Sequence, residues 1–241
     1  MKNLKLAAVC LSCLTMTGCS ALNFSVEGLI NAPKLTSEQS EIHQALIESV
    51  GSNITLKYPK NGEYRSAYVI ANIDDEPTDE AMVFYEYTSN GSEEDGLRVN
   101  ILDKDEDGKW YSVKELAGAG TDIDQVIISP MGNNNQTDVF VGYQNLTNDE
   151  KTMEIYSYTD GDFKRVALDT YSVLEPLDIN NDGYIELITI QRSTNNDTGA
   201  VTAKASMLNM KNNEITRGEN VDMCDNVTSY VSSKTGMLDS G

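Results

Sequence analysis

The hydrophobic pattern of the chain changes once, at Gly51. Over residues 36–51 the apolar positions recur at the spacing of one helix face, and they are Ile42, Ala45, Leu46 and Val50. Glycine is common just past a helix end, so the pattern predicts an amphipathic helix that stops here. From this point on, apolar and polar positions alternate with a period of two, which is typical of β-strands. The sequence therefore predicts an all-β protein preceded by one α-helix.

The β-region is internally repetitive. Three times the chain runs through an apolar strand, a polar loop, a second apolar strand and a hairpin, in units at about residues 66–117, 124–168 and 171–222. The tips of the hairpins, Asp107, Asp160 and Asn212, are about 50 residues apart. Four strands at this period are typical of β-propeller blades.

The number of units falls short of a closed ring. Propellers close with four or more blades, whereas this chain holds three full units and the start of a fourth over residues 226–241. We therefore expect a partial, truncated β-propeller over residues 52–241, in which the early strand at residues 54–58 completes the last blade. An open half-ring that pairs with a second chain and a generic all-β sandwich are the alternatives.

The N-terminus has the pattern of a targeting segment. Lys2 and Lys5 precede an apolar stretch over residues 6–16 that is too short to span a bilayer comfortably, and the stretch ends at Gly18-Cys19. This end resembles the bacterial lipobox. The resemblance implies a signal peptide over residues 1–18, a lipidated (palmitate-bearing) Cys19 and a tether over residues 19–35. It also implies a protein anchored to the extracytoplasmic face of a bacterial cell membrane. An ordinary secretory signal cut nearby and a buried apolar helix are the alternatives.

The charge of the chain narrows the class of partner. The formal net charge is -20, from 18 basic and 38 acidic residues. A surface of this sign repels phosphate backbones, so we expect no nucleic-acid partner. It suits cations, basic partners or neutral sugars.

Residues 178–186 are the best candidate for a metal site. Oxygen-bearing side chains stand at alternate positions, Gly183 permits a sharp bend, and a carboxylate follows three residues on. The predicted calcium ligands are Asp178, Asn180, Asp182 and Glu186. The equivalent loop of the first unit keeps Asp74, Glu76 and Glu80 as candidate ligands, but it lacks the glycine and two residues of loop length.

Two further acidic patterns predict structure rather than chemistry. One acidic residue precedes the second strand of every unit, which indicates a shared structural role for Glu80, Asp138 and Glu186. Residues 103–108 match the first half of an EF-hand loop, but Lys114 stands where the bidentate glutamate belongs. We therefore interpret this stretch as a polar hairpin turn.

The loop at residues 178–186, followed by the strand Leu187-Ile-Thr-Ile190, resembles the FG-GAP and VCBS-type repeats. Every fixed position of that pattern is matched, and the fixed positions are Asp178, Asn180, Asp182, Gly183 and Glu186. The resemblance covers about residues 54–241 in architecture, with a complete motif in the third unit alone. It implies a β-propeller with calcium in its inner loops, used for adhesion or ligand binding.

The sequence contains no recognisable catalytic constellation. His43 is the single histidine and is predicted to be a solvated helix residue, so a Ser-His-Asp arrangement has no support. We therefore expect a non-catalytic, cell-surface binding or scaffold module for a protein or glycan ligand. A glycan-active enzyme that uses paired carboxylates and an envelope-assembly lipoprotein are the alternatives.

Overall fold

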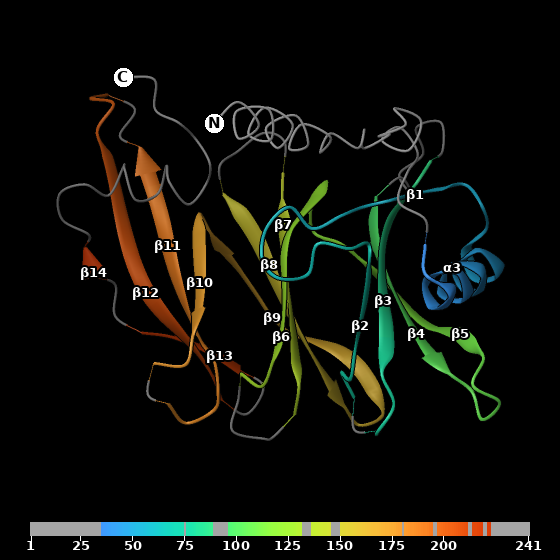
Figure 1. Ribbon diagram of the computed structural model, residues 1–241. Helices are drawn as coiled ribbons and strands as arrows, with labels where there is room; N and C mark the ends of the chain where they lie inside the picture. Colours follow the sequence, from blue (N-terminus) through green and yellow to red (C-terminus); the bar gives the residue numbers. More distant parts are fainter. Residues whose placement is uncertain are drawn as a thin grey trace, which may run out of the picture. The chain divides into compact units, whose positions relative to one another are not determined.

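The computed structural model describes residues 35–74, 76–88, 96–131, 136–145, 150–179, 181–194, 197–211, 214–218 and 221–222 (Figure 1). The chain divides into two units, Met1–Ser37 and Glu38–Gly241. All contacts given below belong to the second unit. The predicted signal peptide, Cys19, Asn180 and the start of a fourth repeat at residues 226–241 lie outside the described residues.

The predicted helix is confirmed as α3 (Ser37–Val50). Its apolar face buries Ile42, Ala45 and Leu46. The backbone N–H of Gly51 donates to the carbonyl of Ile47 at 2.9 Å, and Gly51 has a φ of 85°. Since a positive φ is strained for residues with a Cβ, glycine ends the helix here without cost.

The rest of the described chain is almost entirely strand and turn. The strands are β1 (Ile54–Leu56), β2 (Tyr68–Ala71), β3 (Glu80–Tyr87), β4 (Leu97–Lys104), β5 (Trp110–Ala117), β6 (Asp122–Ser129), β7 (Asp138–Gln144), β8 (Lys151–Thr159), β9 (Asp162–Tyr171), β10 (Val173–Leu177), β11 (Glu186–Thr194), β12 (Val201–Lys211), β13 (Glu214–Arg217) and β14 (Val221–Asp222).

These strands form three antiparallel sheets, and each contains four strands paired in chain order. The first sheet is β2-β3-β4-β5, the second is β6-β7-β8-β9, and the third is β10-β11-β12-β13. The three four-stranded units that the repeat predicted are therefore confirmed. All pairings between the described strands stay within a sheet, so the closure of these units into a propeller remains a prediction.

The prediction for the early strand was wrong. β1 pairs with β3 of the first sheet, where Ile54 lies opposite Tyr87 and Leu56 opposite Tyr85. β2 pairs with the same edge of β3, nearer its N-terminal end, where Tyr68 lies opposite Val83. The physical reason is that β3 is longer than β2, and its remaining backbone groups need partners that β1 supplies. β14 extends the edge of the third sheet in the same way, because it pairs with β12 beyond β13.

The segment between β1 and β2 leaves the first sheet and contacts the second. The N–H of Lys60 donates to the carbonyl of Ile123 at 3.1 Å, and the N–H of Asn61 donates to the carbonyl of Asp124 at 2.7 Å. This loop therefore adds a short backbone connection to β6. It joins two sheets that otherwise meet through side chains.

Side chains on alternate faces of the sheets form separate cores. On β3, Met82 and Phe84 pack against the second sheet, whereas Val83 and Tyr85 pack beneath α3. The helix therefore covers the face of the first sheet that is turned away from the second sheet (Figure 1). Both faces of β3 are buried, which explains why the strand is apolar without a break over residues 81–85 rather than alternating.

The second sheet is buried on both faces as well. Its strand β7 directs Val139 and Val141 towards the first sheet, and Phe140 contributes to a core shared with the third sheet. That core is completed from the third sheet by Leu174, Leu187, Leu208 and Met210. On its other face the third sheet carries a smaller cluster of Val173, Ile190 and Ala203.

The single histidine is not merely solvated, as the sequence had suggested. His43 is partly buried on α3, and its Nδ1 lies 2.8 Å from the hydroxyl of Tyr68 on β2. The two rings also meet edge to face, with centroids 6.2 Å apart. The histidine thus helps to fix the helix on the first sheet. Its partner on β2 could not be identified from helical spacing alone.

Candidate functional site

The loops that join the first and second strands of the three sheets share one hydrogen bond. In each loop a carboxylate at the start of the second strand accepts the backbone N–H of the residue seven positions earlier. The pairs are Glu80 with Ile73 at 2.8 Å, Asp138 with Met131 at 3.0 Å, and Glu186 with Ile179 at 2.9 Å. We call this contact the loop clamp. The shared structural role predicted for the three acids is confirmed.

The third loop is held by further carboxylate contacts to its own backbone. Asp178 accepts the N–H groups of Asp182 at 3.1 Å and Gly183 at 3.0 Å, and Asp182 accepts the N–H of Tyr184 at 2.9 Å. Gly183 has a φ of 90°, which is the bend that its predicted role requires. These contacts build a tight, exposed turn of the kind found in calcium-binding loops.

The calcium ligands predicted for this loop are brought together only in part. Asp178 and Asp182 share one turn, Glu186 is committed to the loop clamp, and Asn180 lies outside the described residues. A carboxylate has about four lone-pair positions, so one or two N–H contacts leave room for an ion. Among the described residues, however, no three His, Cys, Asp or Glu side chains converge on a point that would hold a metal.

The first loop is more deeply enclosed. Asp74 accepts the N–H of Glu76 at 2.7 Å, while the side-chain amide of Asn72 donates to the carbonyl of Thr78 at 3.0 Å. Glu80 is only 3% exposed, and its Oε1 has no hydrogen-bond partner within the described part of the chain.

Burial raises the pKa of the Glu80 carboxyl to about 7, and the neighbouring charges of Asp74 and Asp103 act in the same direction. The hydrogen bond from the Ile73 N–H opposes them, because it stabilises the ionised form. Glu80 is thus a carboxyl whose negative charge is poorly compensated by the protein.

Glu80 lines a cavity of about 180 Å³ formed by the first and second sheets. Its acidic lining residues are Asp74, Glu76, Glu80, Asp103 and Asp162, and its aromatic ones are Tyr111, Tyr158 and Phe163. Lys114 is the one basic residue among the described residues of the lining, and its ammonium group is bound to Asp162 and to the carbonyl of Phe163. This acidic cavity is the candidate ligand site.

The sequence identified half of this site. Asp74, Glu76 and Glu80 were predicted to share a site, and they do line one cavity. Asp103 belongs to a stretch interpreted as a hairpin turn, and that turn is confirmed: the carboxylate of Asp105 accepts the N–H groups of Asp107 and Lys109. The inward position of Asp103 at the end of β4, and the approach of Asp162 from the second sheet, had no signal in the sequence.

A second group of buried polar side chains was also missed. Asp124, on β6, is 1% exposed and accepts hydrogen bonds from the side chains of Asn61 at 2.7 Å, Lys151 at 2.8 Å and Tyr171 at 2.7 Å. It lies at an irregularity in the β6–β7 pairing between Ile123 and Gln125. The sequence gives little hint of this group, because β6 also carries Asp122, Gln125 and Ser129 among its apolar residues.

The Asp124 group borders a cavity of about 340 Å³, whose lining includes Asn61, Lys151 and Ser172. The Asp124 carboxylate is nevertheless surrounded by donors, with an ammonium, an amide and a phenol as partners. Burial raises the pKa of Tyr171 well above its usual value, and the charge of Asp124 adds to this. A saturated carboxylate beside a protonated phenol is a structural contact that joins β6, β8 and β9.

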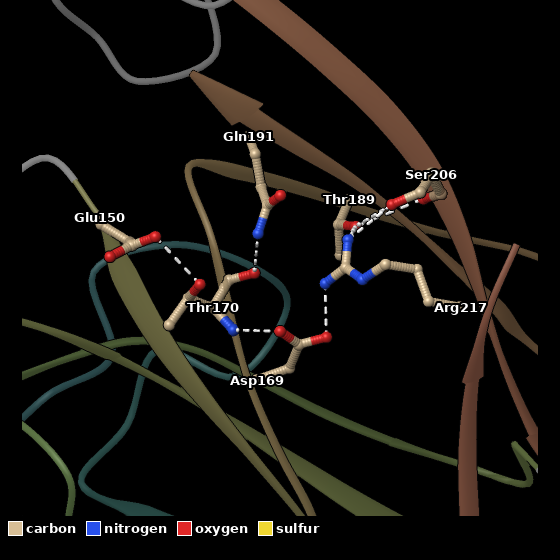
Figure 2. A network of polar contacts seen from close by, with 7 residues as sticks. All are labelled: Glu150, Asp169, Thr170, Thr189, Gln191, Ser206 and Arg217. Atoms are coloured by element: carbon tan, nitrogen blue, oxygen red, sulfur yellow. Dashed lines mark hydrogen bonds and ion pairs between the residues drawn. The ribbon is translucent and has the colours of Figure 1, made fainter. Parts of the chain in front are cut away.

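Polar residues also connect the second and third sheets. Figure 2 shows the guanidinium of Arg217 between Asp169 on β9 and the pair Thr189 and Ser206. The arginine donates to Ser206 at 2.6 Å and to Thr189 at 3.2 Å, and it forms an ion pair with Asp169. Thr170 extends the network to Glu150 at 3.0 Å (Figure 2). Each residue of the network has at least one polar partner within it, so we assign this network to sheet packing.

In the described part of the chain, no helix has the length and apolarity needed to span a membrane. The predicted lipid attachment at Cys19 lies outside the described residues, so it stays a prediction. No protein-family model matches this chain, and no curated protein matches it in sequence.

Proposed function

We propose that this chain is a non-catalytic binding module, built of propeller-type blades and anchored through a lipid on Cys19 to the extracytoplasmic face of a bacterial membrane. The observation that carries the proposal is the threefold loop clamp on three successive four-stranded sheets. A repeated loop, fixed at the same point each time, presents variable side chains on a rigid frame. Such a frame is typical of repeat proteins that bind ligands.

The state of the buried carboxylates favours binding over catalysis. Four carboxylates are buried in the described part of the chain: Glu80, Asp124, Asp138 and Glu154. Asp124 is held by Lys151, Asp138 is bonded to Ser157, and Glu154 is paired with Arg165. Groups committed in this way serve packing, because a catalytic acid or base needs a free path to its substrate.

We further propose that the third loop binds calcium as a structural ion, with Asp178, Asn180, Asp182 and Glu186 as its ligands. The turn formed by Asp178 and Gly183 supports this, since it sets two carboxylates on one short loop. The ion would brace the entry to β11. The ligand-binding role does not depend on it.

The glycan-active alternative has one observation in its favour. Glu80 has a raised pKa and lines the same cavity as Asp103, and glycoside hydrolases use a pair of carboxyl groups of which one has a raised pKa. An envelope-assembly lipoprotein differs from the leading proposal in its partner, not in its chemistry.

Two measurements test the proposal. First, cells that express the full chain are labelled with an alkyne analogue of palmitate, and Cys19→Ser serves as control. Label on the wild type alone supports the anchor, and equal labelling of both contradicts it. Second, the purified protein is applied to glycan and peptide arrays and, in parallel, incubated with a panel of glycosides. Saturable binding without turnover supports the proposal, whereas turnover that is lost in Glu80→Gln replaces it with the enzyme.

A further inference from the structure

The acidic cavity between the first two sheets is lined by a carboxyl group, that of Glu80, one oxygen of which the described part of the protein leaves without a partner. Glu80 is 97% removed from solvent, and its Oε1 has no hydrogen-bond partner among the described residues. Buried carboxylates are normally paired, because an ionised carboxylate loses its hydration on burial and needs hydrogen bonds or an opposite charge in its place. A carboxyl group with an unpaired oxygen, on a residue that lines a cavity, is a candidate acceptor for a cation that enters the cavity.

The cavity is asymmetric in charge. At one side the ammonium of Lys114 already occupies the position next to Asp162 and the carbonyl of Phe163. Glu80 and Asp103 line the cavity as well, and neither forms an ion pair within the described part of the chain. Lys114 shows that an ammonium group on an alkyl chain is accommodated in this wall.

The size and walls of the cavity favour an organic cation over a metal ion. Its volume of about 180 Å³ corresponds to roughly six water-sized groups at about 30 Å³ each. Calcium requires six to eight oxygens within about 2.6 Å, but no three acidic side chains of the described chain converge on one point. Tyr111, Tyr158 and Phe163 supply aromatic surface, which suits methylene groups and ammonium groups alike.

We propose that this cavity binds a primary ammonium group carried on a short alkyl chain, with the carboxylates of Glu80 and Asp103 as its acceptors. A lysine side chain and a free linear diamine both present this chemistry. The aromatic residues enclose the methylene groups, and the carboxylates receive the ammonium hydrogens. The inference rests on the proposed binding function, and it names the ligand class and the residues of one site.

The test is a calorimetric titration of the full chain with two amines, N-acetyl-lysine-N-methylamide and 1,5-diaminopentane. N-acetyl-norleucine-N-methylamide is the uncharged control ligand. Glu80→Gln removes the charge but keeps an oxygen for the loop clamp, and Asp103→Asn changes the cavity without touching the clamp. Asp138→Asn is the matched control, because it makes the same change in the clamp of the second sheet.

We expect at least one amine to bind wild type and Asp138→Asn alike, and to bind Glu80→Gln and Asp103→Asn at least tenfold more weakly. Binding of the lysine derivative alone identifies a peptide source, and binding of the diamine alone identifies a free amine. Equal binding of the norleucine derivative, no binding of either amine, or unchanged affinity in both cavity variants would overturn the inference. Calcium binding that depends on Glu80 in the absence of amine binding would also overturn it. If Glu80→Gln does not fold, the amine affinity of Asp103→Asn, compared with that of the wild type and of Asp138→Asn, tests the inference by itself.

Failure here and failure of the proposed function are distinguishable. An array ligand that binds Glu80→Gln as well as the wild type supports the binding function but contradicts the acidic cavity as the site of binding. Turnover of a glycoside that depends on Glu80 contradicts both the binding function and the amine site.

Discussion

The carboxylate of Asp138 accepts the backbone N–H of Met131 at 3.0 Å, and both residues are buried. The same carboxylate is bonded to the hydroxyl of Ser157 on the neighbouring strand β8. One acidic side chain therefore closes a loop and ties it to the sheet. Its counterpart in the third sheet, Glu186, bonds to Ile179, which is 50% exposed. The loop clamp is thus repeated in geometry but not in burial.

This difference predicts unequal costs for removing the clamp. Asp138→Ala leaves the N–H of Met131 without its acceptor in a buried position, so we expect a loss of about 2 to 3 kcal/mol in the free energy of unfolding. Glu186→Ala should cost less than about 1 kcal/mol, because water can replace the carboxylate at an exposed N–H. Urea unfolding measures both variants. Equal losses would contradict a dependence on burial.

The raised pKa of Glu80 predicts a pH-dependent stability. Its pKa is about 7 in the folded protein, against 4.5 ordinarily. Between these two pH values the folded state retains a proton that the unfolded state has released, so stability is full below pH 4.5 and falls as the pH rises to 7.

We expect Glu80 to account for a loss of roughly 3 kcal/mol across this window. Glu80→Gln has no charge to bury, so its unfolding free energy should lack this contribution. The measurement is urea unfolding of both proteins at intervals from pH 4 to 8. Curves that run parallel would show that Glu80 titrates normally.

The contact between Gly142 and Tyr171 predicts a coupled pair of substitutions. A Cβ at position 142 would overlap the Tyr171 hydroxyl, which donates to Asp124. Gly142→Ala should therefore displace the phenol and destabilise the protein by about 1 to 3 kcal/mol. In a Tyr171→Phe background the overlapping oxygen is gone, so the same substitution should cost less. A double-mutant cycle by thermal or urea unfolding measures the coupling, and additive effects would rule the steric explanation out.

Calcium binding by the third loop predicts a ligand-dependent melting temperature. At a calcium concentration 100 times its dissociation constant, an ion that binds only the folded state adds about 2.7 kcal/mol. Asp182→Ala should abolish this response.

Asp105→Ala is the matched control for the calcium experiment. Asp105 also accepts backbone N–H groups in an acidic turn, but we interpret that turn as a hairpin without an ion. The Asp105→Ala variant should therefore have a lower melting temperature, but this temperature should still rise when calcium is added. A wild-type melting curve that is the same in calcium and in chelator would remove the metal from this loop.

Local patterns in the sequence determined the elements of this protein. Helical spacing predicted α3, and a repeat of about 50 residues predicted three four-stranded sheets. The acid before each second strand predicted a shared structural role, which the structure identifies as the loop clamp. These features depend on residues close together in the chain. The sequence pattern that indicates each feature can therefore be recognised within a limited segment of the chain.

Only the tertiary structure decided which distant residues meet. β1 pairs with β3 because an edge of β3 is left open, and nothing in a short strand shows which edge it will find. Asp124 is bound by Asn61, Lys151 and Tyr171, which come from three other segments. The acidic cavity likewise exists because two sheets pack face to face, which brings Asp162 and Phe163 opposite Glu80. The packing of the sheets determines where these side chains lie. The residues next to them in the sequence do not indicate this packing.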